Sequence, residues 1–139
     1  GKAGVNMNRR RARERALQLL FQIDVGKMET EEAVANAVLA EGETAVDAFT
    51  LELVRGTRQN LDKIDATIAQ YATDWSIDRM ANVDRNVLRL ALYELLYRED
   101  IPNSVAINEA VELVKKYSTP ESGKFVNGIL GRVAENTPH

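Results

Sequence analysis

Apolar residues recur every three or four positions along nearly the whole chain, and no segment of useful length alternates as a strand does. In the first such segment, Leu17, Leu20 and Ile23 share one helical face, whereas Gln18 and Gln22 fall on the other. Helices are expected over residues 9–25, 30–40, from about 44, 61–71, 82–97, from about 104 and from 120. The pattern therefore predicts an all-α fold of about seven helices.

Capping residues indicate where several of these helices begin. Thr30 is a good N-cap, and either Asn103 or Ser104 can cap the helix that follows Pro102. Thr119-Pro120 is the strongest start signal, because threonine favours the N-cap and proline favours the first helical position. The helix over 82–97 is the most apolar, so we expect it to be the central one.

The charge of the chain reverses sign near its beginning. Residues 9–15 hold five arginines and one glutamate, net +4, in a chain of formal net charge −3, so the rest carries −7. Arginine suits a polyanion because its planar guanidinium stays charged, forks onto two phosphate oxygens and stacks on unpaired bases. The remaining surface repels phosphate, which favours binding at this one segment. The alternative is a solvated helix terminus.

Several classes of function lack the residues they need. The only histidine is His139 and there is no cysteine, so we expect no catalytic site, no metal and no cofactor. No glycine-rich loop follows a strand to hold a nucleotide. The absence of cysteine and of an 18-residue apolar run predicts a cytoplasmic protein that does not enter a membrane.

The length fits one domain with a substantial core. We expect a helical domain over residues 9–135 and a frayed tail over 136–139. Residues 1–8 are expected to be either disordered or a cloning remnant, with Met7 a candidate native start.

Four stretches, in order, carry a resemblance to a known family: Arg9-Arg10-Arg11-Ala12-Arg13-Glu14, residues 83–95 (VDRNVLRLALYEL), residues 105–115 (VAINEAVELVK) and residues 124–130 (KFVNGIL). Together they resemble the bacterial NusB family of transcription antitermination proteins. The resemblance implies two helical sub-bundles, helices 1–3 and 4–7. It also implies binding to the single-stranded boxA element of ribosomal RNA leader transcripts, together with the ribosomal protein NusE, in an antitermination complex with RNA polymerase.

The resemblance also assigns candidate site residues. The RNA contacts it implies are Arg9, Arg10, Arg11, Arg13, Ser122, Lys124 and Phe125. The partner face it implies comprises Phe21, Asp84 and Arg85. Spacing alone favours Phe125 as a core residue. Arg15 is less secure, because it could face water or pair with Glu14 of another molecule. Val114 departs from the alanine usual in the family and is expected to repack the core.

Three points stay open. Residues 28–54 contain seven acidic and no basic residues, which favours a solvated acidic face over a binding site, although it could steer a basic partner. A NusB-like domain also occurs in RNA cytosine methyltransferases, which is a rival assignment. A third possibility is a homodimeric helical protein with its arginines in the subunit interface, so the free chain is either a monomer or a homodimer.

Overall fold

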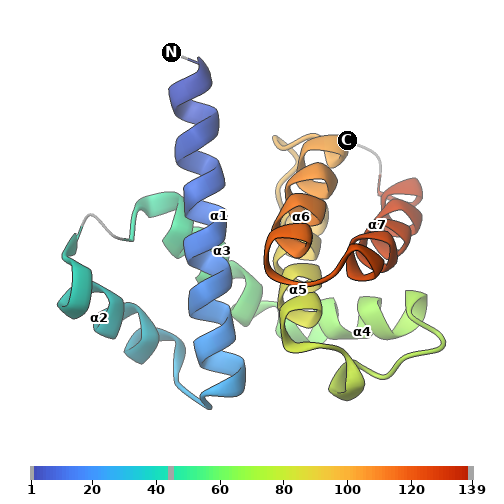
Figure 1. Ribbon diagram of the computed structural model, residues 1–139, viewed down its shortest axis with the longest axis horizontal. Coiled ribbons are helices and arrows are strands. Elements are labelled where there is room, and N and C mark those ends of the chain that lie inside the picture. Colours follow the sequence, from blue (N-terminus) through green and yellow to red (C-terminus); the bar gives the residue numbers. More distant parts are fainter. Residues whose placement is uncertain (1, 44–45, 138–139) are drawn as a thin grey trace. The chain divides into compact units, whose positions relative to one another are not determined.

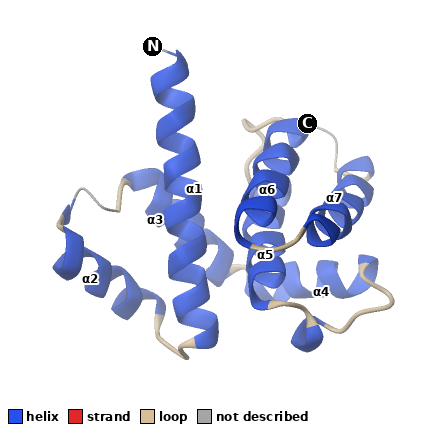
Figure 2. Ribbon diagram, viewed as in Figure 1, coloured by secondary structure: helices blue, strands red, loops and turns tan. Residues whose placement is uncertain are grey.

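The computed structural model describes the backbone of residues 2–43 and 46–137, and the side chains of residues 9–43 and 46–137. Within those ranges it contains seven α-helices, the 3₁₀ turn η2 and no strand (Figures 1 and 2). The elements are α1 (Lys2–Val25), α2 (Thr30–Glu41), α3 (Ala48–Gln59), α4 (Leu61–Tyr71), η2 (Ile77–Arg79), α5 (Asn82–Tyr97), α6 (Asn103–Tyr117) and α7 (Pro120–Glu135). The predicted all-α fold is confirmed. No helix in this part of the chain is long and apolar enough to cross a membrane.

The chain forms two compact units, Gly1–Gln59 and Asn60–His139, and each is described by itself. The first contains α1–α3 and the second α4–α7, which confirms the two expected sub-bundles. The division into a segment 1–8, a domain 9–135 and a tail 136–139 stays a prediction. Helix α1 begins at Lys2, earlier than the predicted Arg9. Of the tail, Asn136 donates a hydrogen bond to the Tyr71 hydroxyl, and residues 138–139 lie outside the described ranges.

The core of the first unit lies where α1 packs against α3 and, less extensively, α2. Helix α1 buries the face predicted for it, with Ala16 and Leu20 fully buried, and α3 contributes Leu53 and Val54. The N-terminus of α3 is capped by Asp47, whose carboxylate accepts a hydrogen bond from the Thr50 amide (2.8 Å). The helix therefore begins at Ala48, and the start expected near Thr44 lies outside the described residues.

Helix α5 is the centre of the second unit, as its apolar sequence predicted. Every residue from Asn86 to Leu95 is buried, and α5 contacts α4, α6 and α7. Its one buried cation in that run, Arg89, is 7% exposed and donates to both carboxylate oxygens of Asp65 on α4 (2.8 Å each). Val114 of α6 is fully buried, so its side chain is part of the core, and the repacking expected there stays a prediction.

Two predicted caps are displaced by one or two residues. Glu29, not Thr30, is the N-cap of α2, and Pro102, not Asn103 or Ser104, is the N-cap of α6. Both caps have extended ψ angles (150° and 141°) and make no side-chain cap bond, so backbone geometry sets these ends. The cap at Thr119 is confirmed, because its side chain accepts from the Ser122 amide (3.1 Å) and Pro120 opens α7.

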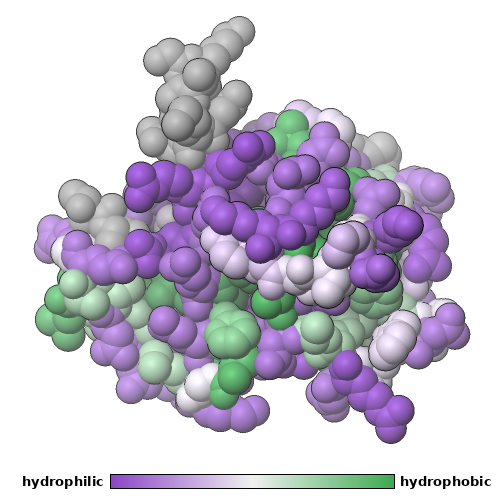
Figure 3. All heavy atoms as spheres, in the orientation of Figure 1, coloured by the Kyte–Doolittle hydropathy of each residue, from purple (hydrophilic) through white to green (hydrophobic). Residues whose placement is uncertain are grey.

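On the face drawn in Figure 3, hydrophilic side chains predominate and hydrophobic ones form separate patches.

Two exposed glycines differ in the space that is available for an added methyl group. At Gly128 on α7 a Cβ has no neighbour within 4 Å, whereas at Gly26 it would lie 2.5 Å from the Gln22 carbonyl oxygen.

Gly128→Ala is expected to raise the free energy of unfolding by about 0.5–1 kcal/mol, because alanine loses less backbone entropy in a helix and meets no obstacle at this position. Urea denaturation followed by circular dichroism measures the change. Gly26→Ala serves as the contrast and should lower the midpoint. A midpoint for Gly128→Ala equal to or below that of the unmodified protein would contradict the prediction.

Candidate RNA-binding surfaces

The arginine cluster, defined as Arg9, Arg10, Arg11 and Arg13, is divided by the packing of α1. Arg10 and Arg11 are exposed, Arg9 is half-buried, and Arg13 is only 3% exposed. Residues 9 and 13 are one helical turn apart and lie on the side of α1 that meets α3. The four-residue spacing of Arg9 and Arg13 predicts that both project toward neighbouring helices, and their contacts with Phe49 of α3 confirm it. Direct contact with RNA is therefore open to Arg10 and Arg11 and largely closed to the buried Arg13.

Both inward arginines, Arg9 and Arg13, lie against one aromatic ring on α3, that of Phe49. The guanidinium carbon of Arg9 lies 4.6 Å, and that of Arg13 5.5 Å, from the centre of the Phe49 ring. These are cation–π distances. The neighbouring Thr50 hydroxyl donates to the Ala12 carbonyl (3.4 Å) and ties the two helices together at this level. Phe49 was not identified from the sequence as part of the site.

Arg15 has a partner within its own unit. Its guanidinium forms an ion pair with Glu41 of α2 (2.6 Å) and donates to Gln18 (3.1 Å). This partner was not among the two expected alternatives, because sequence alone could not place α2 beside this turn of α1.

The seven acidic side chains of residues 28–54 are all exposed: Glu29, Glu31, Glu32, Glu41, Glu43, Asp47 and Glu52. This confirms the solvated acidic face. Two of them are paired across helices. Glu41 pairs with Arg15, and Glu31 accepts two hydrogen bonds from Arg55 (2.6 and 3.0 Å). Those bonds hold the pKa of the Glu31 carboxyl below its usual value.

In the second unit, the first turn of α7 is fixed to the first turn of α5 by a buried carboxylate. Asp84 is 7% exposed and accepts hydrogen bonds from the hydroxyls of Ser122 (2.7 Å) and Ser118 (3.0 Å). Ser122 also accepts from the Thr119 hydroxyl (3.1 Å). Asp84, assigned by resemblance to the partner face, thus lies with the RNA candidate Ser122, and its burial points to a positioning role.

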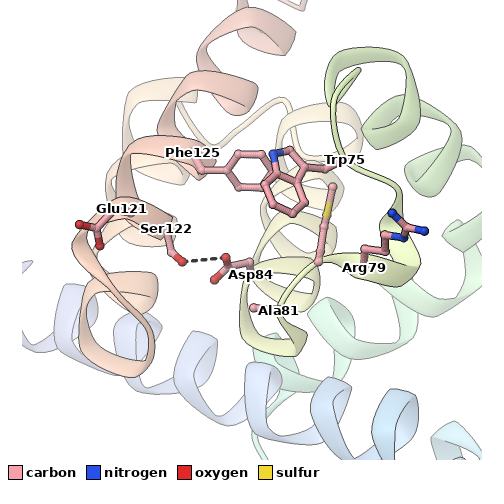
Figure 4. Close-up of a pocket in the computed structure, with 8 residues that line it drawn as sticks. Trp75, Arg79, Ala81, Asp84, Glu121, Ser122 and Phe125 are labelled. Atoms are coloured by element: carbon pink, nitrogen blue, oxygen red, sulfur yellow. Dashed lines mark hydrogen bonds between the residues drawn. The ribbon is translucent and has the colours of Figure 1, made fainter.

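A pocket of about 410 Å³ opens beside this network (Figure 4). It is lined by Trp75, Arg79, Met80, Ala81, Asp84, Glu121, Ser122 and Phe125. The Trp75 and Phe125 rings meet edge to face, with centres 6.5 Å apart and planes at 73°. Arg79 and Glu121 lie at opposite sides of the pocket in Figure 4.

Phe125 is half-buried and lines the pocket, so the core interpretation that spacing alone favoured was wrong. Sequence reasoning missed Trp75, which is 55% exposed in the connection between α4 and α5. A tryptophan among polar residues, outside any helical stripe, was the signal that could have found it. Lys124 is exposed on the same turn of α7 as Phe125 but does not line the pocket.

The remaining candidates for the partner face lie in different units. Phe21 is 38% exposed on α1 in the first unit. Arg85 belongs to the second unit, where it is half-buried and donates to the Ile77 carbonyl (3.1 Å) and the Asn82 side chain (2.8 Å). The bond to Ile77 links η2 to α5, and the bond to Asn82 lies within α5. The partner-binding roles of both residues stay predictions. The described residues contain no group of three or more His, Cys, Asp or Glu side chains suited to a metal ion.

Known proteins share this sequence and this arrangement of helices. The model of the NusB family matches residues 10–135. The transcription antitermination protein NusB of Pelotomaculum thermopropionicum is 55% identical over 131 residues, which cover 94% of this chain and 91% of that relative. The solved NusB of T. maritima is 40% identical with a TM-score of 0.84, covering 94% of this chain and 93% of that chain. A chain in a solved complex of antitermination factors NusB and NusE with double-stranded RNA is 31% identical with a TM-score of 0.81, covering 92% and 96%.

Proposed function

The chain belongs to the NusB family, and on that premise we propose that it is an RNA-binding transcription antitermination factor. It binds the boxA element of ribosomal RNA leader transcripts together with NusE and supports processive transcription of ribosomal RNA by RNA polymerase. The observation that carries the proposal is the exposure of Arg10 and Arg11 on α1 in a chain that is otherwise acidic. The solved complex of NusB and NusE with RNA supports the choice of partners.

In this role the protein acts in the cytoplasm, where transcripts are made, and it contributes binding rather than catalysis. Relatives about half identical to it over nearly their whole length are named as antitermination proteins, which favours this role over a methyltransferase-associated domain. A homodimer with its arginines in the subunit interface stays the alternative, because Arg10 and Arg11 are exposed in the single chain and available to either partner.

Each unit contributes a different kind of contact. In the first unit, backbone phosphates are bound by Arg9, Arg10 and Arg11. The buried Arg13 contacts the same Phe49 ring as Arg9 and does not itself reach the RNA. In the second, an unpaired base stacks on Phe125, with Trp75 at the edge of the same pocket. Ser122 is held at that pocket by Asp84, and Lys124 adds a positive charge on the same turn.

Fluorescence anisotropy with a labelled boxA-like single strand tests the proposal. The protein should bind this RNA more tightly than a scrambled strand of equal length, and NusE should increase the difference. A duplex of the same sequence is a useful third probe, because the solved relative was complexed with double-stranded RNA. Equal affinity for the boxA-like and scrambled strands, with and without NusE, would overturn the assignment.

Phe125→Ala is expected to lower the affinity for the boxA-like strand about fivefold and the affinity for an unrelated strand less than twofold. Base–aromatic stacking is worth about 1 kcal/mol or more per base, and only a specifically placed base reaches the pocket. Phe21→Ala removes an exposed ring from the first unit and should leave RNA affinity unchanged. Equal losses on both strands for Phe125→Ala would assign the ring to folding instead.

A further inference from the structure

Two arginines of the cluster share one aromatic ring, and they do so at different depths. Arg9 is half-buried and lies 4.6 Å from the centre of Phe49, whereas Arg13 is 3% exposed and lies 5.5 Å from it. One guanidinium is thus near the surface and the other beneath it, against the same ring.

The ring itself is held in place. Phe49 is in the first turn of α3, which Asp47 caps through the Thr50 amide (2.8 Å). The Thr50 hydroxyl then bonds the Ala12 carbonyl of α1 (3.4 Å), and Leu53 is fully buried one turn further along. Because cap, helix contact and core fix this turn of α3, the ring has a defined position relative to α1.

Stacking on a ring and binding a phosphate use different parts of a guanidinium. The cation–π contact uses the flat face, and phosphate oxygens accept hydrogen bonds from the N–H edges. An arginine with four side-chain torsions loses conformational freedom when it binds, and a ring that already holds the guanidinium plane reduces that loss. Phe49 can therefore increase RNA affinity without contacting RNA.

We propose that Phe49 is a positioning residue for RNA binding, which orients Arg9 toward the transcript backbone while Arg13 supports the ring from the buried side. This inference rests on the proposed function, because it presumes that Arg9 contacts RNA.

The test is a double-mutant cycle measured by anisotropy on the boxA-like strand. Phe49→Leu removes the ring and is expected to weaken binding about two- to fivefold, while Phe49→Tyr keeps the ring and should stay within about twofold of the unmodified protein. Arg9→Gln should cost clearly less affinity in the Phe49→Leu background than alone. Thermal unfolding of each variant is recorded. If Phe49→Leu has a lowered unfolding temperature, Phe49→Met provides a second variant without a ring.

Arg11→Gln supplies the matched control cycle, because Arg11 is an exposed arginine of the same helix. The losses of RNA affinity caused by Arg11→Gln and by Phe49→Leu should be additive. Three outcomes would each overturn the positioning role. The first is full RNA affinity of a folded Phe49→Leu or Phe49→Met variant, and the second is that the affinity losses of Phe49→Leu and Arg9→Gln are additive. The third is that Phe49→Tyr loses as much RNA affinity as Phe49→Leu. If the unmodified protein fails to bind, or Arg11→Gln has no effect, the proposed function fails. A normal Arg11→Gln loss beside a neutral Phe49→Leu rejects only the role of Phe49.

Discussion

A triple variant in which glutamine replaces Arg9, Arg10 and Arg11 is expected to bind the boxA-like single strand about a hundredfold more weakly at 50 mM salt. This estimate takes about 1 kcal/mol for each lost charged contact. Arg13 is retained because it is buried against Phe49, and its removal would disturb the packing of α1 on α3. Loss of affinity in this variant therefore reports on contact with RNA.

The salt dependence separates phosphate contacts from other effects of these substitutions. If about three to five phosphates are bound, the plot of log affinity against log salt for a single strand should have a slope of roughly −2 to −3.5. Removing three cations should flatten that slope by about 2, because each contact on a single strand releases about 0.7 of a counterion. Anisotropy titrations between 50 and 200 mM salt measure both slopes.

A charge-matched variant controls for the change in net charge. Lys27, Arg55 and Arg58 belong to the same unit but lie outside the arginine cluster, so replacing all three with glutamine removes the same charge. This control should change RNA affinity by less than about threefold. If both triple variants lose affinity equally, or the slope of the unmodified protein is flat, the electrostatic account of the first unit is wrong.

The fold was largely predictable because it follows from local patterns. The apolar run in α5 and the Thr119-Pro120 cap act within a few residues of their own positions, and both were predicted correctly. The caps at Glu29 and Pro102 were missed because extended backbone, rather than a side-chain bond, sets those helix starts.

The candidate sites were predictable in composition but not in depth. Helical spacing separates the inward Arg9 and Arg13 from the exposed Arg11. The position of α3 beside α1 decides how deeply each inward arginine lies, with Arg13 3% exposed and Arg9 half-buried. The contact of Arg9 with Phe49 joins residues 40 positions apart, and the Trp75–Phe125 pair joins residues 50 apart. Such contacts depend on tertiary packing, which no local pattern encodes.

NusE is expected to raise the affinity for the boxA-like strand by about 5- to 150-fold, the range typical of two ligands coupled through one protein. RNA must then raise the affinity for NusE by the same factor, because the binding cycle closes. Anisotropy with and without saturating NusE measures one side of this cycle, and calorimetry of NusE binding with and without RNA measures the other. No change in RNA affinity at saturating NusE would remove the cooperative step from the proposed function.

A connected set of residues in the second unit is expected to transmit part of this coupling. Arg85, a predicted partner residue, follows Asp84 on α5, and Asp84 binds the Ser122 hydroxyl at the pocket that contains Phe125. Ser122→Ala breaks this hydrogen bond and leaves Phe125 in place, so it should reduce the coupling factor more than it reduces the affinity for RNA alone. Ser104→Ala removes an exposed hydroxyl from α6 as the control. If Ser122→Ala lowers RNA affinity by the same factor with and without NusE, Ser122 contributes to RNA binding only, and the coupling runs through other residues.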